Sequence, residues 1–245
     1  GILVSAATGT GGFNTTNYSI TYASGTLTVA ALPVTITGAA VYSGSTSFNT
    51  ATSGSSLSVT NAVNGDTVTV SGTGTLSSAS AGSRSLNSLS GLTLSSSNYT
   101  LTGATSAITV SQAPLGVVLA ATYSGTTTVT PTSFTLIGLV NSETVTSLSS
   151  AVLSSANVSG NGSNYVVSIT KGAGTATLSN YSITAAYNAT TGITTTNTAT
   201  LNTKAITIAA SNQSTTYGTA LALGSSSYSL TSGSLGTGDA ITGVT

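Results

Sequence analysis

Stretches in which hydrophobic residues alternate with small or polar ones recur along the whole chain. Residues 67–70 read TVTV and residues 107–110 read AITV. Alternate side chains of a β-strand share one face, so we expect Val68 and Val70 to point into a core and the threonines toward solvent. β-Branched residues favour strands, and turn signals such as Asn64–Gly65 separate the stretches. The pattern predicts many short strands and no amphipathic helix.

An Asn-Tyr pair begins such an alternating stretch three times. Its tyrosines are Tyr18, Tyr99 and Tyr181, which recur at a nearly constant interval of about 82 residues. A Tyr-Ser-Gly turn occurs at Tyr42 and again, after nearly the same interval, at Tyr123. A constant spacing of this kind indicates a repeated structural unit.

Other landmarks follow the same period in the same order. Pro33 and Pro114 are separated by nearly the same interval as the tyrosines. The segment AVNGDTVTV at residues 62–70 has its counterpart, LVNSETVTS, at residues 139–147. A further copy begins at Lys204 with KAITIAASNQSTTYGTALAL. Several landmarks in one order predict an internal duplication.

The period divides the chain into four parts. We expect residues 1–31 to be the C-terminal part of a truncated repeat and residues 32–112 and 113–203 to be two complete repeats. Residues 204–245 would then be the N-terminal part of a further repeat. The whole chain, at 245 residues, is close to three periods long. This arrangement predicts a segment of a longer tandem array.

The predicted fold of each repeat is an immunoglobulin-like β-sandwich. About seven short strands in roughly 80 residues, with frequent turn signals, are typical of this all-β architecture. The chain has no cysteine and no tryptophan, so the antibody type with its disulfide and core tryptophan is excluded. A β-solenoid is the alternative, but its coils would repeat at about 20 to 30 residues, and no such sub-period is visible.

The amino-acid composition argues against several classes of function. Only three basic and three acidic residues are present, and the net charge is zero. Serine and threonine number 44 and 51. Such a surface offers nothing to hold nucleic acid or anionic lipid, and no apolar run approaches the length of a membrane helix. A net charge near zero also removes the repulsion that keeps copies of a protein apart.

We identify no catalytic, cofactor-binding or metal-binding residues, and we expect the protein not to be an enzyme. There is no histidine to activate one of the many serines. The acids Asp66, Glu143 and Asp239 number one per repeat, too few for calcium, so we interpret them as hairpin-turn residues. An isopeptide crosslink from Lys171 to Glu143, or from Lys204 to an asparagine, is a less favoured alternative.

The repeated tyrosines are candidate structural residues. Because they alternate with isoleucine and leucine, we interpret them as core anchors whose hydroxyls bond to the backbone, rather than as exposed binding platforms. These core anchors are Tyr18, Tyr42, Tyr99, Tyr123, Tyr181 and Tyr217. Pro33 and Pro114 are expected to stiffen the linkers between repeats.

Two groups of motifs resemble known bacterial repeats. The motifs YSGSTSF, VNGDTVTVSGTGTLSSASAG and GLTLSSSNYTLTGATSAITVSQA, within residues 42–113, resemble the YDG repeat. KAITIAASNQSTTYGTALAL and SLGTGDAITGV, within residues 204–244, resemble the related MBG repeat, an immunoglobulin-like module. The chain departs from the YDG pattern where Ser43 and Ser124 replace the aspartate, and where Gly218 directly follows its tyrosine.

The resemblance implies a place in a large protein of the filamentous-haemagglutinin type, at the bacterial cell surface or outside the cell. We therefore expect a structural segment of an adhesin or extracellular filament that self-associates through strand edges and uncharged Ser/Thr surfaces. Its partners would be neighbouring repeats or further copies, with a host or surface contact also open, and it would need no cofactor. The alternatives are a passive stalk with a distal adhesive domain, and a module that binds a glycan or protein.

Overall fold

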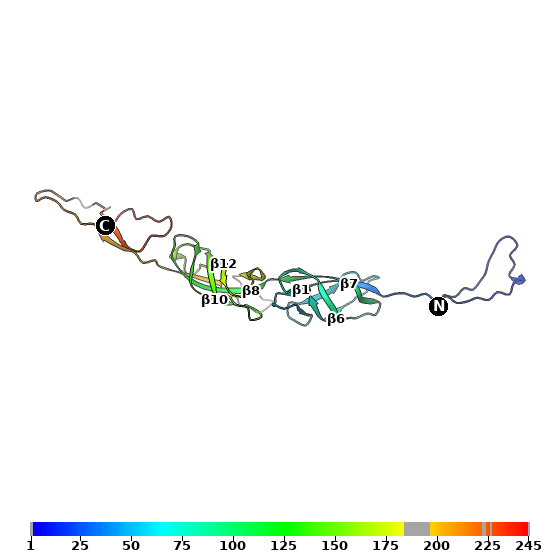
Figure 1. The fold of residues 1–245 in the computed structure, drawn as a ribbon. Helices are drawn as coiled ribbons and strands as arrows, with labels where there is room; N and C mark the ends of the chain where they lie inside the picture. The colour runs from blue at the N-terminus through cyan, green and yellow to red at the C-terminus, as the bar shows by residue number, and fades with distance from the viewer. Residues whose placement is uncertain (1, 184–196, 222–223, 226, 245) are drawn as a thin grey trace.

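The computed structural model describes residues 2–183, 197–221, 224–225 and 227–244. Strands dominate, and the helical elements among these residues are three short 3-10 turns: η1 (Thr15–Asn17), η2 (Val158–Gly160) and η3 (Leu178–Asn180). Figure 1 shows two strand-rich bodies, one after the other along an elongated molecule. The prediction of an all-β fold built of sandwiches is confirmed, and the described residues form paired sheets rather than the coils of a solenoid.

The first body is a sandwich of two sheets. Their strand orders are β3–β1–β7–β5 and β2–β4–β6. The strands are β1 (Leu32–Val41), β2 (Ser47–Asn49), β3 (Ser56–Val59), β4 (Val70–Leu76), β5 (Gly82–Arg84), β6 (Leu86–Leu94) and β7 (Tyr99–Ser111). The first strand, β1, lies antiparallel to β3 and parallel to β7, the last strand of the same body.

The core of this sandwich follows from the period-two pattern. Val34 and Ile36 on β1 are buried, as are Ile108 and Val110 on the neighbouring β7. Phe48 on β2 packs into the same core from the opposite sheet. The alternating threonines point outward, so each strand buries one face and presents hydroxyls on the other.

The second body repeats this plan. One sheet has the order β10–β8–β13, with β14 also paired to β8, and the other has the order β12–β11–β9. The strands are β8 (Ala113–Thr122), β9 (Thr128–Val129), β10 (Pro131–Ile137), β11 (Ser147–Leu153), β12 (Val166–Ala173), β13 (Tyr181–Ile183) and β14 (Asn197–Asn202). Both β13 and β14 lie parallel to β8, as β7 lies parallel to β1. Alternate residues of β8, among them Leu115, Val117 and Leu119, are buried.

The two bodies are joined almost without a linker. Strand β7 ends at Ser111 and β8 begins at Ala113. The expectation of linker prolines is therefore wrong, because Pro33 is the second residue of β1 and Pro114 the second residue of β8. Proline is tolerated at a strand start, where its missing N–H removes no essential ladder bond.

The two ends of the chain carry less structure. In residues 2–31 the described strand contact is an isolated bridge between Ile2 and Gly25. In residues 204–244, β15 (Thr207–Ala210) and β16 (Tyr228–Ser232) form an antiparallel hairpin. None of the described helices is long and apolar enough to cross a membrane.

Candidate functional site at the module junctions

Each of the three repeats presents one acidic residue from a tight turn. The amide of Asp66 donates to the carbonyl of Val63 over 3.0 Å, and the amide of Glu143 donates to Val140 over 3.0 Å. The amide of Asp239 donates to Gly236 over 3.1 Å. The shared geometry places a carboxylate at the same end of each repeat.

The turns themselves depend on residues that tolerate left-handed backbone. Asn64 has φ of 56° and the equivalent Asn141 has φ of 52°. Asparagine adopts this region more readily than most side chains. The Asn-Gly-Asp and Asn-Ser-Glu motifs are therefore turn motifs, as the sequence predicts.

Glu143 joins two modules through its carboxylate. One oxygen accepts a hydrogen bond from the hydroxyl of Tyr42 in the first sandwich. The other accepts from the hydroxyl of Tyr181, in its own sandwich, over 2.6 Å. The rings of Tyr42 and Tyr181 meet edge to face, with centroids 5.4 Å apart and an interplanar angle of 81°. Two phenols and one carboxylate thus meet at the junction of the two sandwiches. Of these residues, Tyr42 and Glu143 are 101 positions apart in the chain.

The surroundings keep both phenols protonated. Burial raises the pKa of Tyr42, and its hydrogen bond to Glu143 raises it further. Burial and the bond to the same carboxylate also raise the pKa of Tyr181 well above the usual value of about 10. Both hydroxyls therefore remain donors throughout the physiological range.

Two further hydrogen bonds hold this junction. The amide of Ala81 in the first sandwich donates to the side-chain oxygen of Asn180 over 3.0 Å. The side-chain amide of Asn141 donates to the carbonyl of Gly44 over 2.9 Å. Asn180 is buried, and the bond from Ala81 satisfies its side-chain oxygen. The Asn-Tyr pair and the acidic turn of one module thus both contact the preceding module.

The next junction repeats part of this arrangement. The hydroxyl of Tyr123 donates to the carboxylate of Asp239 over 2.8 Å. The amide of Thr237, in the acidic turn, donates to the carbonyl of Ser124 over 2.7 Å. The bond to Asp239, followed by burial, raises the pKa of Tyr123. The Tyr-Ser-Gly turn of one module therefore contacts the acidic turn of the next at both junctions.

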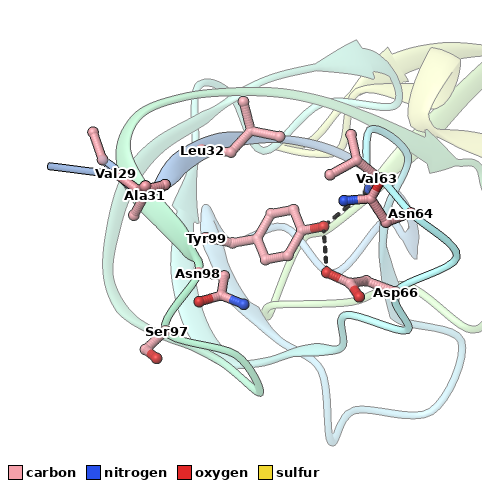
Figure 2. Close-up of a pocket in the computed structure, with 10 residues that line it drawn as sticks. Val29, Ala31, Leu32, Val63, Asn64, Asp66, Ser97, Asn98 and Tyr99 are labelled. Carbon is pink, nitrogen blue, oxygen red and sulfur yellow. Dashed lines mark hydrogen bonds between the residues drawn. The ribbon is translucent and has the colours of Figure 1, made fainter. Parts of the chain in front are cut away.

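The first sandwich has the same tyrosine–acid pair, but on an open face. The hydroxyl of Tyr99 donates to Asp66 over 2.9 Å and accepts from the amide of Val63 over 2.9 Å. Figure 2 shows these bonds among the residues that line a pocket, which include Asn98 and Leu32. The volume of this pocket is about 380 Å³. Asp66 and Asn98, the equivalents of Glu143 and Asn180, are exposed here, whereas Tyr99 is buried like Tyr181.

The structure places the predicted tyrosines in three environments. Tyr42, Tyr99 and Tyr181 are buried, and Tyr123 is half-buried. For Tyr18 and Tyr217 the prediction of a core anchor is wrong.

Tyr18 is 59% exposed and stacks on Phe13, and Tyr217 is fully exposed. The physical reason is the same for both. The described residues around them build no two-sheet sandwich, so neither ring has an opposite face to pack against.

The sequence pattern predicts that the three acids are turn residues, and it does not predict their hydrogen bonds with tyrosines. A signal was present, since the chain has just three acids and each occupies the same place in its repeat. Within the described residues, no three potential metal-ligating side chains lie together.

The lysines of the isopeptide alternative have other partners. Lys171 donates to the backbone carbonyls of Gly174 and Ala176, and Lys204 donates to the carbonyl of Leu235. Glu143 accepts from two tyrosines, so both groups of the Lys171–Glu143 alternative are hydrogen-bonded to other partners.

These features define an all-β protein with two β-sandwich modules that a tyrosine–carboxylate contact joins. Residues 26–107 match the YDG domain family, and the match covers most of the first sandwich. No curated protein matches the chain, and no solved structure does.

Proposed function

We propose that this chain is a structural segment of a large secreted bacterial surface adhesin or extracellular filament, in which β-sandwich modules are locked end to end. The observation that carries the proposal is the Tyr42–Glu143–Tyr181 contact. This contact gives the junction a defined geometry. A spacer needs such a geometry to keep a constant length.

Three features of the junction support rigidity. Strand β7 passes into β8 with Gln112 alone between them, so little free backbone is available for bending. Hydrogen bonds to a charged acceptor are stronger than neutral ones, at about 1.5–3 kcal/mol each when shielded from water. The edge-to-face contact of Tyr42 and Tyr181 adds directional packing. Together they resist both bending and rotation.

The surface supports association between copies. The edge strands β3 and β10 contain no charged residue. Lysine and other charges on edge strands normally prevent pairing between proteins. Arg84 on edge strand β5 and Lys171 on edge strand β12 donate to backbone carbonyls of their own module, so the uncharged edges are those of β3 and β10. We therefore include self-association through strand edges in the proposed function. The passive stalk differs from this proposal in that its copies would remain separate.

Small-angle X-ray scattering of the full chain at low concentration tests the rigid junction. We expect a rod-like distance distribution for the wild type. The Tyr42→Ala variant should broaden that distribution, because it removes the ring and the hydroxyl that contact Tyr181 and Glu143 of the second module. Tyr165→Ala is the matched control, since Tyr165 is an exposed tyrosine of the second module. Identical scattering from wild type and Tyr42→Ala would contradict the proposal.

Sedimentation velocity over a concentration series separates the self-associating filament from the passive stalk. Growth of larger species with concentration supports association. A monomer at every concentration supports the stalk.

A further inference from the structure

Each sandwich begins and ends with strands that are parallel neighbours. In the first sandwich β1 pairs with β7, from Leu32 opposite Tyr99 to Val41 opposite Ser111. In the second sandwich β8 pairs in the same direction with β13 and then with β14. Because parallel strands run the same way, the start of the first strand and the end of the closing strand lie at opposite ends of the ladder.

The connections of each module pull on these two ends when the chain is under tension. Residues 2–31 lead into β1 from the end of the first sandwich that faces away from the second (Figure 1). At its other end β7 passes into β8 through Gln112 alone. Tension along the chain therefore pulls β1 at its first residue and β7 at its last residue, in opposite directions. The two strands are pulled past one another along their own axes.

This direction of pull loads the hydrogen bonds of the ladder together. The longest unbroken part of the ladder has seven residue pairs in the first sandwich, along residues 35–41, and six in the second, along residues 117–122. Sliding must break these bonds at the same time, whereas pulling two strands apart at one end breaks them pair by pair. Forced unfolding depends on the unfolding barrier, and that barrier is higher when many bonds must break at once.

Further bonds fasten the end of each closing strand. The amide of Tyr42 donates to the carbonyl of Ser111 over 2.8 Å, and the hydroxyl of Ser111 donates to the carbonyl of Ala40 over 3.2 Å. In the second sandwich the amide of Tyr123 donates to the carbonyl of Asn202 over 2.9 Å. The residue at which tension leaves each closing strand is thus bonded to the segment that ends the first strand.

The closing strand is also held along its second edge in both sandwiches. In the first, β7 lies between β1 and β5. In the second, the side chain of Asn161 accepts from the amide of Leu201 and donates to its carbonyl, over 2.8 Å in each case. The amide of Ala199 donates to the carbonyl of Asn164 over 3.0 Å. Residues 161–164 therefore hold β14 where the first sandwich uses a strand.

Buried side chains cover the core side of both ladders. Ile36 on β1 and Ile108 on β7 are buried, as are Val117 on β8 and Leu201 on β14. Water cannot readily replace backbone bonds beside such side chains. Sliding of the strands must also expose apolar surface, which adds to the cost.

We propose that the parallel first and closing strands make each sandwich a tension-bearing module, which resists unfolding when the chain is pulled along its length. The inference rests on the proposed function as a structural segment and adds resistance to tension to it. It depends on strand order within each module and not on the Tyr42–Glu143 contact, because the covalent chain through Gln112 carries the load across the junction.

Single-molecule force spectroscopy of the full chain tests the proposal with two directions of pull. The sequence has no cysteine, so introduced cysteines are unique attachment points. Ala30→Cys with Gln112→Cys places the attachments at opposite ends of the β1–β7 ladder. Ala30→Cys with Ser97→Cys places both at the same end, where the amide of Leu32 donates to the carbonyl of Asn98 over 2.9 Å. Circular dichroism checks that both variants are folded.

We expect a several-fold higher unfolding force for the pull from opposite ends, at one loading rate. Equal forces in the two directions would overturn the inference. That result would leave the rigid junction standing, since scattering tests the junction separately. A flexible junction in scattering, combined with direction-dependent forces, would instead contradict the proposed rigid spacer alone.

A second comparison separates the ladder from the junction. Gln112→Cys with Thr203→Cys places attachments on either side of the second sandwich. In this background we expect Asn161→Ala to lower the unfolding force, because it frees one edge of β14. Glu143→Gln is the control and should leave the force unchanged, although it removes the charged acceptor at the junction. A larger drop in force for Glu143→Gln than for Asn161→Ala would show that the ladder does not bear the load.

Discussion

The covered face of the second sandwich and the exposed face of the first, which includes Asp66 and Tyr99, are built from equivalent residues in different surroundings. Glu143 receives two phenol hydrogen bonds, one from each module, whereas Asp66 receives its phenol bond from Tyr99 of its own module. In both faces the hydroxyl of the inner tyrosine also accepts a backbone amide, from Val63 or Val140. The inner tyrosine–acid pair therefore forms without a neighbouring module.

The different hydrogen bonds of Glu143 and Asp66 show which part of the junction each module supplies. Each module holds its own acceptor in place, and the neighbour adds a second tyrosine to an arrangement that already exists. Binding to a preorganised site avoids the entropy cost of ordering the site at the moment of contact. Repeats of this kind can therefore dock along an array without rearranging their cores.

The largest expected effect comes from removing the inner tyrosine. Tyr181→Ala should lower the free energy of unfolding by about 3–5 kcal/mol, because it deletes a buried aromatic ring and one partner of the junction. Tyr99→Ala should cost less, since Tyr99 packs within one module and has no partner across a junction. Chemical denaturation followed by circular dichroism measures both. Equal losses in the two variants would contradict a contribution from the junction.

The next effect comes from the acids. Glu143→Gln should lower the free energy of unfolding by about 2 kcal/mol, because two phenols lose a charged acceptor. Asp66→Asn should cost less, since one phenol is affected and the face is open. The comparison is made by urea denaturation at neutral pH. A larger loss at Asp66 than at Glu143 would reverse the assignment of covered and open faces.

The outer tyrosines allow a finer comparison. Tyr42→Phe removes the hydroxyl that bonds to Glu143 and keeps the ring, so we expect a loss of about 1 kcal/mol. Tyr123→Phe should produce no resolvable change in stability, because its bond to Asp239 is exposed to water. Thermal unfolding of both variants beside the wild type distinguishes these results. A larger shift for Tyr123→Phe would show that the second junction is the stronger one.

The smallest effect is a dependence on alkaline pH. The pKa values of Tyr42 and Tyr181 are raised in the folded protein, so the unfolded chain loses these protons first as the pH rises. The stabilisation is thus fully present below pH of about 10 and declines as the pH rises further. Urea denaturation from neutral to alkaline pH measures this decline. Tyr42→Phe should show a shallower decline, and an unchanged slope would contradict the role of the phenols.

Much of the architecture can be predicted from the local pattern of hydrophobic and polar residues. The period-two alternation predicts the inward faces of β1 and β8, and the constant spacing of the repeated tyrosines aligns the two sandwiches. The same alternation would bury Tyr18 and Tyr217, which are exposed. Alternation shows which face a residue occupies in a strand, but burial also requires a second sheet opposite that face.

The repeat, the all-β character and the positions of the turns can all be read from the amino-acid sequence, because they depend on local pattern and on its recurrence. Other features required the folded chain: the first and last strands of each sandwich run parallel, Pro33 and Pro114 lie inside strands, and Glu143 joins two tyrosines. Tyr42 and Glu143 are 101 positions apart in the chain. A hydrogen bond over that separation depends on how two folded modules dock, and no local pattern encodes docking geometry.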